Sequence, residues 1–480
     1  NLDDVSADYQ KAFRCFQRGA LDSALLIFKA IELERAAENI VSEQGRTQVL
    51  RDEYIRRDSE KNKRKRETND ALRFKAQLHQ TQFEYDRAGE AFDLLIRLDS
   101  NNVSNLDVYA YYLTNQKQTD KAIILYRRCL LLTDPKGLNP AFLNNLGYLH
   151  KIRNESVTAK KMFETALEIN RNLAKSNPKI ILPFVAQTLN NLALLQFQNN
   201  EFSDAETSYM EAMEIYKNLG EDSSNIFLPD EALLLHNLTI LHMTQHEFAK
   251  AEKYCQQAVE IRKNLANINP QIYLPLLAGT LQNLAILKSK ENRLSVADSF
   301  YRESLVIYRP LAKKNPQAYL PIIAQALNNL GRLSLDVKNL RAADTMLNEA
   351  LEICRGLVNQ NPNDYLPIMA MVLHNLGNLH FEKHELLTAE RDYIEALNIR
   401  RNFSKIDSLA YLLDLSETLN NLACLRKEKK EFSSAADGFQ EALDIRRFFA
   451  KTNPNTFLPL VAETLYNYSN LRKNMREYSL

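Results

Sequence analysis

Apolar residues along most of the chain recur at intervals of three and four, the spacing that places them on one face of an α-helix. Residues 183–198 follow this spacing, and Pro183 stands in the expected first turn, where its missing N–H costs nothing. After a polar break, residues 202–219 show the same spacing and predict a second helix. An N-P dipeptide, as at Asn269 and Pro270, is expected to end the second helix and begin the turn into the next one. The pattern therefore predicts antiparallel helix pairs.

The helix pair repeats every 46 residues, as the sequence L-N-N-L-G at Asn144 and Asn145 shows. Its second asparagine returns at this interval as far as Asn467, and a proline column and an isoleucine column keep the same register. Three columns in register exclude a coincidence of composition. The repeated unit is therefore structural, and it is the helix pair.

A single helix pair cannot bury both of its apolar faces, so consecutive pairs are expected to stack around a continuous core. Small residues stand at matching positions of both helices, where close crossings are expected. They are Gly147, Ala193, Ala285, Gly331, Gly377 and Ala423 in the first helix, and Ala205, Ala251, Ala297, Ala343, Ala389 and Ala435 in the second.

This pattern resembles the tetratricopeptide repeat, and its lengthened helices look like those of the kinesin-light-chain type. The resemblance lies in N-L-G/A in the first helix, an alanine twelve residues later, and A-L-x-I in the second helix. It covers residues 137–480 and implies an all-α fold, a right-handed α-solenoid of antiparallel helix pairs. The usual period is about 34 residues, so a period of 46 implies longer helices or loops.

Four parts are predicted along the chain. Residues 1–41 form a degenerate N-terminal helix pair, residues 42–70 a charged helical connector, and residues 71–136 two repeats of the 34-residue type. Residues 137–480 form the array of 46-residue repeats and end in a half repeat.

The connector carries a run of basic residues, a pattern that nuclear-import and nucleic-acid patches share. Acidic Asp58, Glu60 and Glu67 intersperse the run and favour a solvated helical connector instead. The basic residues are Lys61, Lys63, Arg64, Lys65 and Arg66.

Composition and charge exclude several classes of function. The chain has 61 Lys plus Arg against 60 Asp plus Glu, and a net charge of +1 argues against a nucleic-acid partner, whose phosphates must be neutralised. The 11 glycines are scattered, so neither a dinucleotide fingerprint nor a P-loop is present. No apolar run approaches the roughly 18 residues of a membrane span, so we expect no membrane partner.

We expect no catalytic residue, no metal site and no cofactor. The five cysteines form no C-x-x-C pair, a pattern typical of a reducing compartment and here of the cytoplasm. His242 with His246, and His380 with His384, are spaced i, i+4 and would share a helix face if the helix continues that far. The stretch H-F-E-K-H lacks the zinc-protease motif, and recurrence at the repeat period favours a packing or turn role.

The asparagine column is the best candidate for function. In tetratricopeptide repeats this position faces the concave groove and, in relatives, hydrogen-bonds the backbone of an extended peptide. A primary amide suits that role because it offers both a donor and an acceptor. The alternative is that the asparagines bond a neighbouring helix and serve only the stack. The residues to which the resemblance gives the peptide-binding role are Asn145, Asn191, Asn237, Asn283, Asn329, Asn375, Asn421 and Asn467.

Three positions after each asparagine, the side chains change from apolar to polar along the chain. Such a gradient suits a ligand with one apolar and one polar stretch, and ordinary packing is the alternative. The residues are Tyr148, Leu194, Ile240, Ile286, Arg332, Asn378, Cys424 and Asn470.

These patterns predict a non-enzymatic scaffold that binds an extended peptide or a partner protein in its concave groove. One alternative is the sensor or regulatory segment of a larger multidomain effector enzyme, with its catalytic domain outside residues 1–480. A helical-repeat RNA binder is the other, but it predicts a period near 35 and a basic groove. No pattern in the sequence sets the oligomeric state.

The array has two predicted interruptions and an unfinished end. Ser224 replaces the N-P proline in one connection, and Ser408 and Leu413 replace both prolines in another, so these connections are expected to be the more mobile ones. Leu480 falls where a second helix should begin, which predicts that the chain continues or that the last helix acts as a cap.

Overall fold

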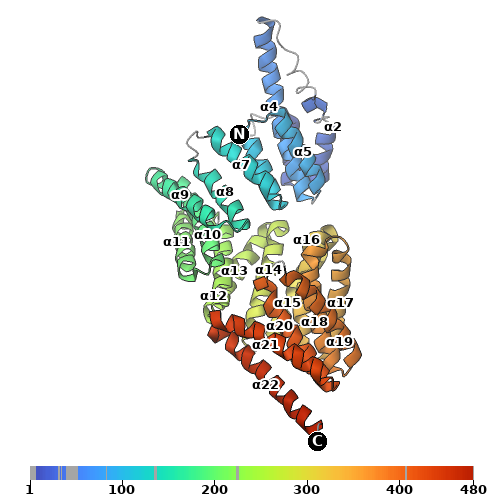
Figure 1. The fold of residues 1–480 in the computed structure, drawn as a ribbon. Coiled ribbons are helices and arrows are strands. Elements are labelled where there is room, and N and C mark those ends of the chain that lie inside the picture. Colours follow the sequence, from blue (N-terminus) through green and yellow to red (C-terminus); the bar gives the residue numbers. More distant parts are fainter. Residues whose placement is uncertain are drawn as a thin grey trace. The chain divides into compact units, whose positions relative to one another are not determined.

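The computed structural model describes residues 7–30, 33, 35–38, 52–82, 84–133, 138–222, 226–405 and 408–478 (Figure 1). Every element within these ranges is an α-helix, and successive helices pack against one another in pairs. The predicted all-α solenoid of helix pairs is therefore confirmed. The predictions made on Gly137, Ser224 and Leu480 lie outside the described residues.

The chain divides into two compact units, an N-terminal unit of Asn1–Leu241 and a C-terminal unit of His242–Leu480. The helices that begin in the N-terminal unit are α1 (Ala7–Gln17), α2 (Leu21–Ala30), α4 (Asp52–Thr81), α5 (Tyr85–Leu98), α6 (Val103–Asn115), α7 (Thr119–Thr133), α8 (Pro140–Ile152), α9 (Ser156–Ala174), α10 (Pro178–Gln198), α11 (Phe202–Asp222) and α12 (Leu228–Thr244). Those of the C-terminal unit are α13 (Phe248–Ile268), α14 (Pro270–Lys290), α15 (Leu294–Lys314), α16 (Pro316–Asp336), α17 (Leu340–Val358), α18 (Pro362–Glu382), α19 (Leu386–Ser404), α20 (Ser408–Glu428), α21 (Phe432–Thr452) and α22 (Pro454–Tyr478).

The first helix of a pair begins earlier than the sequence pattern predicts. In α10 the first residue is Pro178 of the N-P dipeptide, so Pro183 lies inside the helix rather than at its start. Asn269 is both the C-cap of α13 and the N-cap of α14. The connection between these two helices is therefore this single residue, and Pro270 already belongs to α14. Proline is tolerated at the first position because an N1 residue has no intrahelical N–H bond to lose.

The turn inside each pair depends on one residue with a left-handed backbone. Asn154 and Asn200, one repeat apart, have φ values of 60° and 63°. His246 and His384 occupy the same repeat position, with φ values of 60° and 59°. Because α12 and α18 end before these two residues, the i, i+4 histidines do not share a helix face, and the predicted turn role is confirmed.

Small residues allow close crossings within a pair, as the sequence predicts. A Cβ atom added to Gly377 would lie 2.6 Å from the Tyr393 ring, and one added to Gly147 would lie 2.8 Å from the Phe163 ring. Ala193 and Ala285 occupy the same repeat position and are fully buried.

The predicted domain boundaries at 41/42 and 136/137 fall outside the described residues and stay predictions, and the one at 70/71 falls within α4. The first half of α4 extends beyond α5 (Figure 1). The helix α10 has the length and apolar composition of a membrane span, but half of its most apolar window is buried inside the structure, as in a core helix of a repeat array.

Candidate functional site

The asparagine column links the first helices of consecutive pairs through amide bridges. In each bridge, the second asparagine donates from Nδ2 to the Oδ1 atom of the first asparagine one pair earlier, as from Asn191 to Asn144 at 3.1 Å. The bridge from Asn237 to Asn190 is 2.8 Å long, and Asn237 is itself buried. The other bridges run from Asn375 to Asn328 at 2.8 Å and from Asn467 to Asn420 at 3.4 Å. Each bridge uses one of the two N–H donors of the amide.

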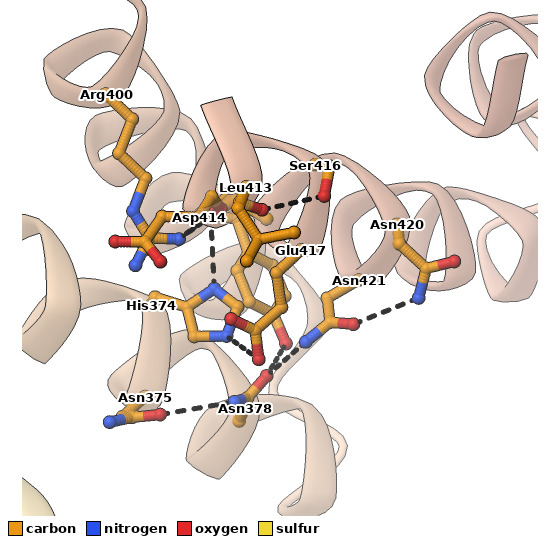
Figure 2. Close-up of polar contacts among 12 residues, drawn as sticks. His374, Asn375, Asn378, Arg400, Leu413, Asp414, Ser416, Glu417, Asn420 and Asn421 are labelled. Atoms are coloured by element: carbon orange, nitrogen blue, oxygen red, sulfur yellow. Dashed lines mark hydrogen bonds and ion pairs between the residues drawn. The ribbon is translucent and has the colours of Figure 1, made fainter. Parts of the chain in front are cut away.

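The bridge changes where a histidine replaces the first of the two adjacent asparagines. Figure 2 shows this arrangement around His374, which precedes Asn375. Here Asn421 donates instead to the Oδ1 atom of Asn378 at 2.9 Å, and the Tyr393 hydroxyl donates to the same oxygen at 2.6 Å. His374 lies 3.2 Å from the Thr418 hydroxyl and 3.6 Å from the Glu417 carboxylate. The nearby His374 lowers the pKa of the Glu417 carboxyl to about 2.

The remaining predicted site residues lie on the same first-helix positions. Asn145 is half-buried and begins the column. Asn329 is half-buried and hydrogen-bonds the buried Tyr301. Asn283 is half-buried as well. The column thus forms one row of asparagines on the first helices of each unit, which we call the first-helix row. Whether its members bind a ligand stays a prediction.

A polar hollow of about 510 Å³ opens on this row in the C-terminal unit. Its lining comes from α16, α18, α20 and α22, together with Tyr393 of α19. Asn421 and Asn467 line it, and so do three members of the variable column, namely Arg332, Asn378 and Cys424. Ion pairs occupy its rim, with Lys338 2.7 Å from Glu382. The hollow therefore combines amides with paired charges.

A second hollow, of about 570 Å³, opens on the first-helix row of the N-terminal unit. Asn144 and Asn145 line it beside apolar side chains from α6, α9 and α10. Tyr111 and Phe184 are 62% and 48% exposed, which leaves two aromatic rings at its edge. The remaining lining residues are Asp107, Val108, Tyr126, Asn139, Pro140, Ala141, Asn170, Leu173, Ile181, Gln187 and Thr188.

Histidines and cysteines serve the packing of the described residues. His242 lies 2.7 Å from Glu247 across the turn from α12 to α13, and His150 pairs with Glu155 in the same way. Burial raises the pKa of the Cys354 thiol to about 12 and that of Cys424 to about 11, so both are protonated at neutral pH. Within the described ranges, no three His, Cys, Asp or Glu side chains gather as metal ligands do.

The predictions from the sequence miss a column of buried side chains in the second helices that bond a neighbouring first helix. Arg262 donates to the Leu276 carbonyl at 3.0 Å and to the Thr280 hydroxyl. At the same repeat position, Tyr308 donates to the Pro275 carbonyl at 3.0 Å. A 46-residue alignment of the repeats exposes this column, but no sequence signal names the acceptors.

A family model described as "Tetratricopeptide repeat" matches residues 185–219, 232–271, 323–364 and 369–402. No curated protein matches the sequence.

Solved structures that resemble the chain include the crystal structure of BtubC (BKLC) from P. vanneervenii, at 21% identity over 60% of this chain and 90% of that one, with a TM-score of 0.30. The apo form of RapI is 17% identical over 63% and 99%, with a TM-score of 0.44. A tetratricopeptide repeat protein from Parabacteroides merdae is 15% identical over 63% and 94%, with a TM-score of 0.38. These TM-scores are too low for an inference about this chain. The family model thus identifies four tetratricopeptide repeats in the chain, and the repeat columns and the helix pairs agree with this identification.

Proposed function

We propose that the chain is a non-enzymatic, cytoplasmic scaffold that binds an extended peptide segment of its partner along the first-helix row. The observation that carries this proposal is the position of the two hollows. Both open on the row, one in each unit, and both are lined by members of the asparagine column.

The chemistry of the row supports a peptide ligand. An extended peptide presents an N–H and a C=O at each residue, and an amide side chain can pair with either group. The bridges occupy only part of the hydrogen-bonding capacity of each amide, so an asparagine can hold the neighbouring helix and a ligand together. The structural role and the binding role are therefore compatible at one position.

A display selection tests the proposal. A random peptide library is selected against the full chain, and the affinity of the selected peptides is measured for Asn145→Ala and for Val157→Ala. Val157 is the matched control because it is 85% exposed and lines neither hollow. Loss of one backbone contact costs about 1 kcal/mol, so Asn145→Ala should weaken binding about fivefold.

The control should leave the affinity unchanged. Peptides that bind with full affinity to Asn145→Ala but lose affinity for Val157→Ala would contradict the proposed face. Five cysteines with free thiols support the cytoplasmic location, and fractionation of the native protein checks it.

A further inference from the structure

The N-terminal hollow lies at a repeat position that carries a longer side chain in most of the later repeats. Asn170 lines the hollow near the end of α9. At the equivalent positions of later repeats, arginines reach across to the next first helix. Arg400 donates to the Asp414 carbonyl at 2.7 Å, and Arg446 donates to the Leu460 carbonyl at 2.8 Å. The column consists of Asn170, Tyr216, Arg262, Tyr308, Cys354, Arg400 and Arg446.

Each buried arginine of this column also donates to a threonine hydroxyl four residues after the carbonyl. The acceptors are Thr280 for Arg262 and Thr418 for Arg400, and Arg446 reaches Thr464 at 2.8 Å. A carbonyl and a threonine hydroxyl therefore form a recurrent acceptor pair for one guanidinium.

The same acceptor pair is present beside Asn170. Thr188 and the Phe184 carbonyl occupy the matching positions, and the Thr188 hydroxyl donates to that carbonyl at 2.8 Å. The equivalent bond from Thr280 to the Leu276 carbonyl is 2.9 Å, so the two sites share one geometry. An asparagine is too short to replace an arginine, and Asn170 and Thr188, both buried, are part of the lining of the hollow of about 570 Å³.

The surroundings of the pair suit a cation. Of the described residues that line the hollow, Asp107 alone carries a charge, and it makes no ion pair within the described part of the chain. Burial raises the pKa of its carboxyl, because desolvation penalises the charged form. The exposed rings of Tyr111 and Phe184 provide faces on which a guanidinium can stack.

We propose that this hollow binds an arginine side chain of the peptide ligand. The guanidinium donates to the Phe184 carbonyl and the Thr188 hydroxyl, as the chain's own arginines do in later repeats, and pairs with Asp107. The inference depends on the proposed function and adds to it the identity of one anchoring side chain.

Short peptides test the anchor directly. The probes are acetylated and amidated alanine peptides with one central arginine, citrulline or lysine, titrated to millimolar concentration against the full chain at low salt. Citrulline keeps the shape of arginine but removes its charge. We expect saturable binding of the arginine peptide, about tenfold tighter than that of the citrulline peptide. Equal affinities, or no binding of the arginine peptide, would reject the proposal.

Four variants locate the binding. Asn170→Arg supplies an internal guanidinium and should abolish binding of the arginine peptide, whereas Asn170→Ala keeps the space and should retain it. Thr188→Val should weaken binding, and the matched Thr280→Val, whose pocket Arg262 already fills, should not. Unchanged binding to a folded Asn170→Arg protein would overturn the assignment.

The two proposals fail in different ways. If display-selected peptides bind the first-helix row but need no arginine, only the anchor is wrong. If they bind elsewhere, the proposed function is wrong as well.

Discussion

The hollow beside Asn170 in the N-terminal unit has a volume of about 570 Å³, whereas the hollow at the equivalent place beside Arg400 in the C-terminal unit has about 180 Å³. The helices around both places come from the same repeat pattern, so the backbone does not explain the difference. Arg400 fills its place and is only 4% exposed. Several lining residues differ between the two places, and the side chain at this repeat position, Asn170 or Arg400, is one of them.

This comparison also separates two uses of one fold. Where the column carries a long side chain, the donor and the acceptors belong to the same chain, and the contact stabilises the stack. Where it carries Asn170, the acceptors remain and the donor is absent among the described residues. Under the proposal above, the chain gains a binding site by shortening one side chain of one repeat, without a change in its helices.

Shortening Arg400 should have the largest effect. Arg400→Asn removes a buried donor to the Asp414 carbonyl and the Thr418 hydroxyl and leaves a cavity. We expect a loss of about 3 kcal/mol in the free energy of unfolding of the C-terminal unit, measured by denaturant titration. An unchanged free energy of unfolding would show that Arg400 does not stabilise the contact between consecutive helix pairs, and would contradict the comparison with Asn170.

Enlarging a small residue at a close crossing should have the next largest effect. Gly377→Ala places a methyl group against the Tyr393 ring, and overpacking of this kind costs about 1–3 kcal/mol. Gly356→Ala is the control, because nothing lies within 4 Å of its added methyl group. The control should stabilise helix α17 by roughly 0.5–1 kcal/mol. Equal thermal melts of the two variants would contradict the close crossing.

Much of this fold can be predicted from the sequence, because each repeat carries the apolar pattern of one helix pair. The 46-residue columns predict the pairs, and Gly147 and Gly377 mark close crossings that the structure contains. The helix start at Pro178 is not predicted, since the sequence-based prediction places Pro183 in the first turn. Proline is favoured in the first turn, because further inside a helix it removes one backbone hydrogen bond, so Pro183 predicts a later start than the structure has.

The site is only partly predictable from the sequence. The resemblance indicates the asparagine row. The bridge from Asn191 to Asn144, however, depends on the offset between neighbouring helices, and the repeat period does not predict that offset. The departure at Asn170 is visible once the repeats are aligned. What it opens depends on Phe184 and Thr188 in the next helix, and only the structure brings them together.

Removing an amide bridge should have a smaller effect. Asn191→Ala loses the donor to Asn144 and should destabilise the N-terminal unit by about 1 kcal/mol. Asn145→Ala, at the start of the column, should change stability by less than about 0.5 kcal/mol. Thermal melts of both variants measure the difference, and a larger loss for Asn145→Ala would reverse the assignment of structural and ligand-facing amides.

Acid sensitivity at the His374 network should be the smallest effect. The pKa of Glu417 falls from 4.5 to about 2 in the folded chain, so its contribution is present above about pH 4.5 and is lost as the pH falls towards 2. The contribution is small because 57% of the side chain is exposed. Glu417→Gln should therefore lose less stability than the parent between pH 5 and pH 2 in urea titrations, and an identical loss would exclude a role for this carboxyl.

Photo-crosslinking with a display-selected peptide tests most directly whether the first-helix row is the binding face. The peptide carries a diazirine side chain, and mass spectrometry locates the crosslinks on the full chain. Binding on the row predicts crosslinks at residues that line the hollows, such as Tyr111 and Gln187 or Arg332 and Glu463. Crosslinks confined to exposed second-helix residues such as Val157 and Leu387, with none on the row, would contradict it.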